Sequence, residues 1–164
     1  MKILRAEPDD WRHVRDLRLR ALLETPDAFG STHAHEAVGG EDAWRSWATG
    51  WPRAGDQALF AALDEGVWVG IALGVRWEDD AEDVNLYAMW VEPSSRRRGG
   101  GRALVEAVSR WARDLGVNRI VLTVTEGNAA ALALYRQTGF VDTGVREALR
   151  EGSGTRTVVM HRRL

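Results

Sequence analysis

Apolar residues recur along this chain with two different periods, and each period predicts one kind of secondary structure. From Pro8 to Glu24 they return every three or four positions, which predicts an amphipathic helix with the proline in its first turn. The same spacing from Leu104 to Leu115 predicts another helix, and Gly116 is suited to end it. Shorter helices are expected over about Glu41–Thr49 and Asn128–Gln137.

Strand signals fill most of the remaining chain. Ile120–Thr125 alternates apolar and polar residues, as a half-buried strand does. The Asp64-Glu65-Gly66 turn between two apolar runs predicts a hairpin, whereas the acidic run Glu78–Asp83 is expected to form a loop. The predicted strands are Lys2–Arg5, Ala58–Leu63, Val67–Trp77, Val84–Val91, Ile120–Thr125, Phe140–Arg146 and Thr155–Arg162. Without a repeat or a long linker, this order predicts a single α/β domain over residues 1–164, with helices on both faces of one mixed sheet.

Composition narrows the classes of function. The 164 residues include no cysteine and carry a net charge of −2. These values exclude a disulfide framework and a zinc-thiolate site, and they argue against general polyanion binding, because nucleic-acid-binding domains are usually basic. No apolar run approaches the length of a membrane span and no signal peptide is evident, so a cytoplasmic protein without membrane contact is expected. No metal site is expected, because His33 and His35, which share a face only if their segment is extended, have no carboxylate pattern nearby.

The stretch from Met89 to Leu104 combines a strand end, a glycine loop and a helix start. Three arginines (96–98) and three glycines (99–101) follow Pro93. The first N–H groups of a helix have no partner inside the helix and favour a phosphate, glycine lets the backbone approach it, and arginine adds charge. A nucleotide P-loop fits poorly because Arg102 follows the last glycine, and a dinucleotide motif fits poorly because Leu104 stands where a third glycine is needed. A glycine-rich turn beside a solvated basic patch remains an alternative.

A second motif lies about 30 residues further on, between Asn128 and Phe140. Asn128 is a plausible helix N-cap, and Tyr135 lies about two turns later, close to the same face. The spacing Arg96-x-x-Gly99-x-Gly101 resembles the R/Q-x-x-G-x-G/A coenzyme A loop of the GNAT (GCN5-related) N-acetyltransferases. The second motif resembles their N-x-x-A-x-x-L-Y-x-x-x-G-F pattern. The resemblance covers Val67–Phe140 well, and the first 66 residues only in layout; Asn128 as a simple cap and Tyr135 as a half-buried core residue remain the plainer alternatives.

The resemblance implies a mostly antiparallel sheet in which the strands Val84–Val91 and Ile120–Thr125 splay apart. It implies transfer of an acetyl group from acetyl-CoA directly to a primary amine. The pantetheine arm would pair with the strand backbone, the pyrophosphate would bind the loop amides, and Tyr135 would be the catalytic acid for the departing thiolate. The residues implied for the cofactor are Met89, Trp90, Val91, Arg96, Arg97, Arg98, Gly99, Gly100, Gly101, Arg102, Asn128 and Tyr135.

The catalytic base stays unassigned. Thr123 stands where the ribosomal-protein acetyltransferases have a glutamate, and it cannot serve. Glu126, Asp83 and Glu82 are candidates, although each is also an ordinary loop acid.

The acceptor is equally open. By family layout, the loop Phe29–Thr32 and the side chain of Tyr87 would line its site, and even spacing places Tyr87 on one strand face with Met89 and Val91. Three tryptophans, Trp44, Trp47 and Trp51, have two interpretations. They either line an apolar pocket for the acceptor or belong to the hydrophobic core.

Two other functions compete with the enzyme. A non-catalytic acyl-CoA-binding regulatory module would keep Arg96–Gly101 but need no acid at Tyr135. A nucleic-acid protein would use the three arginines, but no aromatic residues are interleaved with them and the net charge is negative. A homodimer is conceivable, with the last strand, Thr155–Arg162, pairing across subunits.

Overall fold

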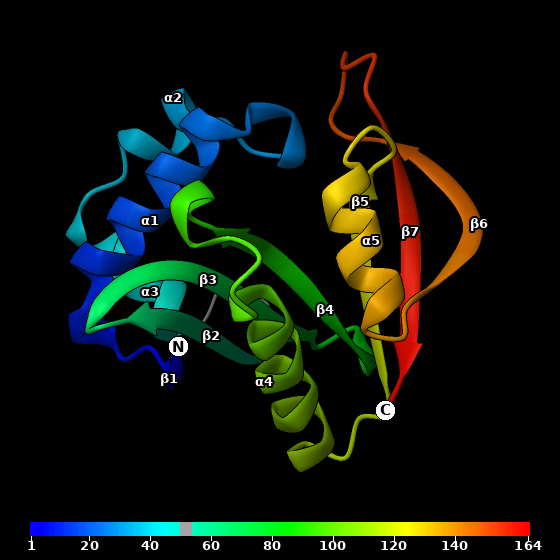
Figure 1. Cartoon of the computed structure of the whole chain (residues 1–164), viewed down its shortest axis with the longest axis horizontal. Coiled ribbons are helices and arrows are strands. Elements are labelled where there is room, and N and C mark those ends of the chain that lie inside the picture. Colours follow the sequence, from blue (N-terminus) through cyan, green and yellow to red (C-terminus); the bar gives the residue numbers. More distant parts are fainter. Residues whose placement is uncertain (50–53) are drawn as a thin grey trace.

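The computed structural model describes residues 1–49 and 54–164, and within these ranges seven strands form one mixed sheet (Figure 1). The strand order is β1-β2-β3-β4-β5-β7-β6, and β4 and β5 form the parallel pair among antiparallel neighbours. The strands are β1 Lys2–Arg5, β2 Ala54–Asp64, β3 Val67–Trp77, β4 Asp80–Val91, β5 Arg119–Thr125, β6 Val141–Ala148 and β7 Arg156–Arg163. The predicted mixed, mostly antiparallel sheet is confirmed.

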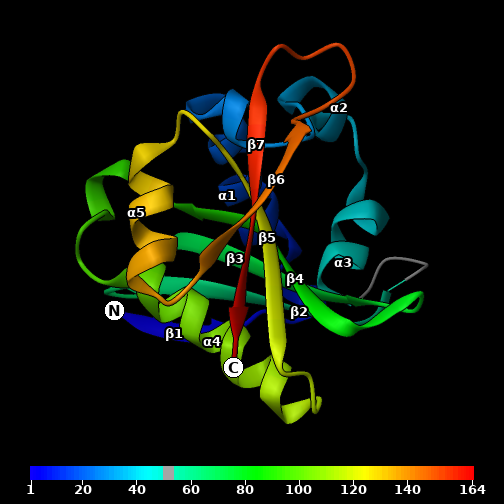
Figure 2. The ribbon, with the colours of Figure 1, turned by 90° about the vertical axis from the view of Figure 1, so that its right-hand side faces the viewer.

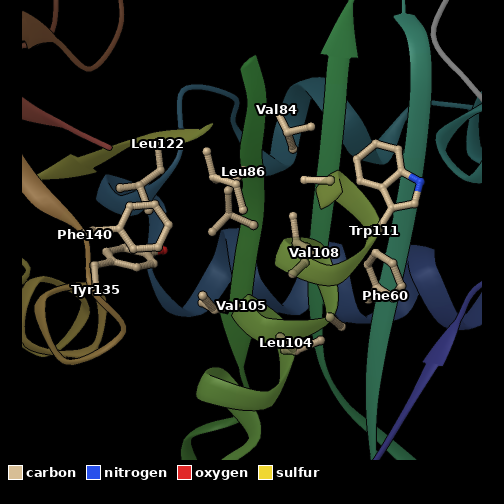
Figure 3. Packing of buried hydrophobic residues seen from close by; sticks show 14 of the residues in the cluster. Phe60, Val84, Leu86, Leu104, Val105, Val108, Trp111, Leu122, Tyr135 and Phe140 are labelled. Atoms are coloured by element: carbon tan, nitrogen blue, oxygen red, sulfur yellow. The ribbon is translucent and has the colours of Figure 1, made fainter. Parts of the chain in front are cut away.

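Helices cover both faces of this sheet, as predicted. They are α1 Trp11–Glu24, α2 His33–Ala37, α3 Glu41–Thr49, α4 Gly100–Asp114 and α5 Ala129–Gln137, with 3₁₀ turns η1 Pro8–Asp10, η2 Pro26–Ala28 and η3 Pro93–Ser95. The apolar stripe of α1 packs with β3 in one core cluster, whereas α4 and α5 pack against the other face (Figure 3). In the described ranges, no helix combines the length and the apolar character needed to cross a membrane.

Two segments differ from the sequence prediction. Residues His33–Ala37, for which no element was predicted, form the short helix α2, and the Thr32 hydroxyl accepts a hydrogen bond from the amide of His35. His33 and His35 therefore lie two positions apart on a helix and do not share a face. The prediction of a loop over Glu78–Asp83 is wrong in part, because β4 already begins at Asp80, which pairs with Trp77 of β3.

A bulge interrupts β4 next to the predicted anion loop. Tyr87 pairs with Leu73, whereas Trp90 pairs with Ile71, so two residues of β4 oppose one residue of β3. Ala88 within the bulge has a φ of 51°, a left-handed conformation that is uncommon outside glycine. The extra residue reverses the alternation of faces along the strand.

Tyr87 therefore does not share a face with Met89 and Val91, and that prediction is wrong. Its partner Leu73 belongs to the cluster under α1, whereas Met89 and Val91 pack into the cluster under α4. The even spacing that predicted a shared face holds only for an uninterrupted strand.

The parallel strands β4 and β5 are paired only where both begin. Their register pairs are Val84 with Ile120 and Asn85 with Val121, and beyond these the strands separate (Figures 1 and 2). The predicted splay is thus confirmed. On its other side β5 pairs with β7, and β7 is also paired with β6. Both edges of β7 are thus paired within the chain, so a dimer through this strand would have to open one of these pairings.

Candidate active site

A cavity of about 690 Å³ opens where β4 and β5 diverge. Every residue predicted to bind the cofactor lines it except Arg98, so residues from β4, the arginine–glycine loop, α4 and α5 come together. Its walls also include residues that were not among those predicted to bind the cofactor, from the turn after α1, the loop before α4, and α5. The added residues are Thr25, Ala28, Phe29, Ser95, Ala130, Ala131, Ala133, Leu134 and Gln137.

The first turn of α4 supplies the floor for an anion. Gly99 is its N-cap, with a left-handed φ of 86° that favours glycine, and the first bond of the helix runs from Ala103 N to Gly99 O at 3.0 Å. The amides of Gly100, Gly101 and Arg102 precede that bond, so they are the unpaired donors of a helix start. All three residues line the cavity, so this end of α4 is a candidate anion-binding site.

The three consecutive arginines have different surroundings. Arg98 turns away to β2, where its guanidinium forms an ion pair with Asp64, and this pairing keeps its side chain from the cavity. Arg96 donates through Nε to Val91 O at 2.8 Å and through Nη2 to Glu24 Oε2 at 2.7 Å. Arg97 and Arg102 line the cavity without a carboxylate partner in the described part of the chain.

Glu24 is a polar residue of this region that the motifs did not reveal. Its carboxylate accepts hydrogen bonds from Thr25 Oγ1, from Trp90 Nε1 at 3.0 Å and from Arg96. Burial alone would raise the pKa of Glu24, but these hydrogen bonds and the positive charge of Arg96 outweigh it and lower the pKa to about 2. The carboxylate is therefore ionised at all physiological pH values.

Tyr135 lies on α5 at the wall of the cavity and is 6% exposed. Its ring packs edge to face against Phe140 at 5.6 Å, and Leu122 lies beside both rings (Figure 3). Burial raises the pKa of the phenol, because the charged form loses solvation. Asn128 begins the helix as predicted, with Oδ1 accepting from Ala131 N at 3.1 Å, and it also lines the cavity. Asn128 is therefore a cap and remains available as a predicted ligand.

The candidate bases lie in different places. Asp83 is buried in a two-bond ion pair with Arg119 at the start of β4, and Glu82 precedes it. At about 3.4 Å per residue, this end of the strand is roughly 20 Å from Met89, so neither acid can act at the cavity. Glu126 instead lines a second cavity, of about 640 Å³, that shares walls with the first at Thr25, Ala28 and Asn128. Its carboxylate forms an ion pair with Arg146 at 2.8 Å.

Of the residues proposed for the acceptor site, some line a cavity and others belong to the core or lie elsewhere. Phe29 lines the main cavity, but Gly30–Thr32 and Tyr87 do not. Trp44 is a core residue, 2% exposed, and Trp47 packs against the cluster under α1, so the core interpretation holds for these two. Trp51 lies outside the described residues. Within the described ranges, no group of three or more histidine, aspartate or glutamate side chains is arranged to hold a metal ion.

Known proteins share both the sequence pattern and this fold. Streptothricin acetyltransferase of Streptomyces lavendulae is 30% identical over 130 residues, which are 79% of this chain and 62% of that protein. A mycothiol acetyltransferase of Propionibacterium freudenreichii is 31% identical over 134 residues, 78% of this chain and 41% of that protein. The chain thus spans less than two thirds of the length of these curated relatives.

Solved structures match along the whole chain. An acetyltransferase of the GNAT family from Streptococcus pneumoniae superposes with a TM-score of 0.82 at 23% identity, covering 99% of both chains. The structure of yncA, a putative acetyltransferase from Salmonella typhimurium with its cofactor acetyl-CoA, gives 0.80 at 21% identity, covering 100% of this chain and 94% of that one. At such identities the likeness establishes the fold alone. The sequence model of the acetyltransferase (GNAT) family matches residues 17–140, well over half of the chain, and the chain therefore belongs to that family.

Proposed function

We propose that this protein transfers an acetyl group from acetyl-CoA directly to a primary amine. One observation carries the proposal: the residues with unpaired amides at the start of α4 and Tyr135 of α5 line the same cavity, next to the end of β4 that has separated from β5. A phosphate-binding helix end and a proton donor in one cleft fit a phosphorylated acyl donor whose thiolate must leave. The curated relatives are named as acetyltransferases of streptothricin and mycothiol, which favours small-molecule amines in a first acceptor screen.

The cavity suits coenzyme A in size and in chemistry. Its volume of about 690 Å³ lies within the range of small-molecule sites. Glu92 N donates to Val69 O of β3 at 2.7 Å, so the amide and carbonyl of Val91 face the opposite edge of β4, toward the splay. The amide on this edge can pair with a carbonyl of a pantetheine arm, whereas the carbonyl of Val91 already accepts a hydrogen bond from Arg96 Nε. Arg97 and Arg102 add positive charge beside the α4 amides.

Acetyl-CoA supplies the thioester carbonyl, and the protein supplies position and protons. A backbone N–H on the open edge near Met89–Val91 is placed to stabilise charge that develops on the carbonyl oxygen. The hydroxyl of Tyr135 donates to the departing sulfur. The base that deprotonates the amine remains open; Glu126 is the remaining candidate of the three, because it alone lies beside the cavity.

Thermal unfolding with and without acetyl-CoA tests the proposal directly. A ligand at about 100 times its Kd adds roughly 2.7 kcal/mol to the free energy of unfolding. For a domain of this size, the expected rise in Tm is about 5–10 °C. Turnover is then followed as free thiol released in the presence of a panel of primary amines, which separates an enzyme from a non-catalytic acyl-CoA-binding module.

A matched pair of variants shows whether the ligand occupies this cavity. A Cβ at Gly101 would lie 3.1 Å from Leu134 and 3.3 Å from Met89, both of which line the cavity, so Gly101→Val should reduce the shift in Tm. Arg110→Val places the same side chain on the exposed surface of the same helix and should keep the shift. No shift at millimolar acetyl-CoA, or an equal loss in both variants, would contradict the proposal.

A further inference from the structure

Two features oppose a negative charge at Glu24, although its hydrogen bonds and the charge of Arg96 stabilise the carboxylate on balance. It is the last residue of α1, where the helix dipole is negative and an acidic side chain is destabilising. It also touches the loop that carries the proposed phosphate site, through Arg96. A negative charge beside a site for a polyanion weakens binding of that polyanion, so the role of this carboxylate calls for a physical explanation.

Its contacts identify the residue on which it acts. Oε2 of Glu24 accepts hydrogen bonds from Thr25, Trp90 and Arg96. The guanidinium of Arg96 also donates to Val91 O. Arg96 is a cavity residue, but its Nε donates to Val91 O and its Nη2 donates to Glu24. The same arginine thus occupies an acceptor on the open edge of β4, and two of its donor groups are already engaged before a phosphate arrives.

The cavity wall does not depend on Glu24 alone. The turn after α1 is fixed independently, because Thr125 Oγ1 donates to Asp27 O at 2.6 Å and Arg150 Nη1 donates to Phe29 O at 3.0 Å. Neutralising Glu24 should therefore release Arg96 without removing the wall that Thr25, Ala28 and Phe29 form.

We propose that Glu24 is a positioning residue that competes with the phosphates of coenzyme A for Arg96 and so limits the affinity of the protein for acetyl-CoA and CoA. The inference rests on the proposed function, because it takes CoA as the ligand of the cavity. With Glu24 in place, the arginine remains on the carboxylate and on Val91 O; a bound phosphate must draw it away. Weaker retention of the product CoA is the consequence for turnover. Because the pKa of Glu24 is about 2, the competition persists across the physiological pH range.

Calorimetric titration of the full chain with CoA tests this competition. Glu24→Gln keeps the shape of the side chain and removes its charge, so its Kd should be roughly two- to fivefold lower than that of the wild type, the range of a partly exposed ion pair. In an Arg96→Gln background the same change at Glu24 should lower Kd by clearly less, because the arginine for which the two anions compete is missing and only direct repulsion by the carboxylate is relieved. In steady-state assays, Glu24→Gln should lower KM for acetyl-CoA and should not raise kcat.

Glu92→Gln is the matched control. Glu92 is a neighbouring carboxylate that pairs with Arg20 and not with Arg96, so its loss should leave Kd nearly unchanged. An unchanged or higher Kd in Glu24→Gln overturns the inference. So does an equal decrease in Glu24→Gln and Glu92→Gln, or a decrease of undiminished size in the Arg96→Gln background. If the wild type binds CoA but the variants give one of these contrary results, the inference about Glu24 fails and the proposed function stands. If the wild type does not bind CoA, both fail.

Discussion

Burial decides what Tyr135 can contribute to the reaction. Its raised pKa keeps the phenol protonated over the whole physiological range, so a donor is always present at the cavity wall. An alkyl thiol has an ordinary pKa of about 8.5, lower than that of the phenol, and complete proton transfer from Tyr135 to a thiolate is therefore uphill. We expect this residue to stabilise the departing sulfur mainly by a strong hydrogen bond.

Tyr135→Phe should retain the fold and lose most of the activity. The variant keeps the ring that packs against Phe140 and loses only the hydroxyl, so Tm should change little. The value of kcat should fall by about 100-fold, the lower end of the usual effect of a positioned proton donor. Stopped-flow single-turnover kinetics measures the chemical step, and an unchanged rate there would remove Tyr135 from the mechanism. In the wild type, ionisation of this phenol should cause no fall in kcat at any pH up to about 10.

Glu24 also makes a pH-dependent contribution to stability whose sign follows from its lowered pKa. A carboxyl group with a pKa of about 2 in the folded protein, against 4.5 ordinarily, stabilises the fold fully above its ordinary pKa. That contribution is lost as the pH falls toward 2. The difference in Tm between the wild type and Glu24→Gln should therefore be largest near about pH 7 and shrink steadily between about pH 5 and pH 3. A difference that grows on acidification would show that the carboxylate is not held as described.

The predictability of these residues depends on how local their roles are. The amides of Gly99–Arg102 and the cap at Asn128 act within a few residues of the chain, and their spacing alone indicated them. The role of Glu24 depends on Arg96, 72 residues away, and no local pattern announces such a pair. Arg98 is the opposite case. The loop motif predicted it to bind the cofactor, but its side chain forms an ion pair with a distant carboxylate, Asp64.

At the level of elements, α4 is held in place by a glycine in β3. An ideal Cβ at Gly74 would lie 2.7 Å from Cζ3 of Trp111 and 3.1 Å from Cγ1 of Val108, so the absence of a side chain lets α4 sit directly on the strand. Trp111 is itself only 8% exposed and has little room to move. This contact positions the helix whose first turn carries the unpaired amides of the cavity.

Gly74→Ala should thus destabilise the protein by overpacking. The expected cost is about 1–3 kcal/mol, which corresponds to a fall in Tm of roughly 2–12 °C. Differential scanning calorimetry provides the measurement. Gly154→Ala is the control, because a Cβ there meets nothing within 4 Å, and its Tm should stay within about 2 °C of the wild type. Equal Tm values for the two variants would mean that α4 is not held by this contact.

Element boundaries were predictable where periodicity was long and failed where pairing decided them. The helix Glu41–Thr49 and the strand Val67–Trp77 have their predicted limits, because their apolar patterns match the faces they bury. The acidic residues at the start of β4 join the strand because β3 offers a partner and Arg119 neutralises Asp83. The bulge at Ala88 has no sequence signal, since an alanine there does not announce a positive φ.

For the whole molecule, the splayed sheet needs a bridge across its open end. β4 and β5 are paired only at their beginnings, so the C-terminal strands are joined to the N-terminal part at the cavity mouth by separate contacts. Thr125 holds Asp27 O, and Arg150, in the connection between β6 and β7, donates to Phe29 O. These contacts connect residues roughly 100 positions apart and fix the turn that lines both cavities.

Removing the arginine from this bridge should loosen the mouth without unfolding the core. Arg150→Ala loses a charge-assisted bond to Phe29 O, and we expect faster amide hydrogen exchange over residues 25–30 with unchanged protection in α4. Arg146→Ala is the matched control, because Arg146 pairs with Asp142 and Glu126 and does not reach the turn. The turn lines both the main cavity and the second cavity, in which Glu126, the remaining candidate base, lies, so Arg150→Ala should also raise KM for the amine by several-fold. If exchange over residues 25–30 were the same in both variants, the bond from Arg150 would not hold the turn, and the bond from Thr125 to Asp27 O would remain as the bridge at the cavity mouth.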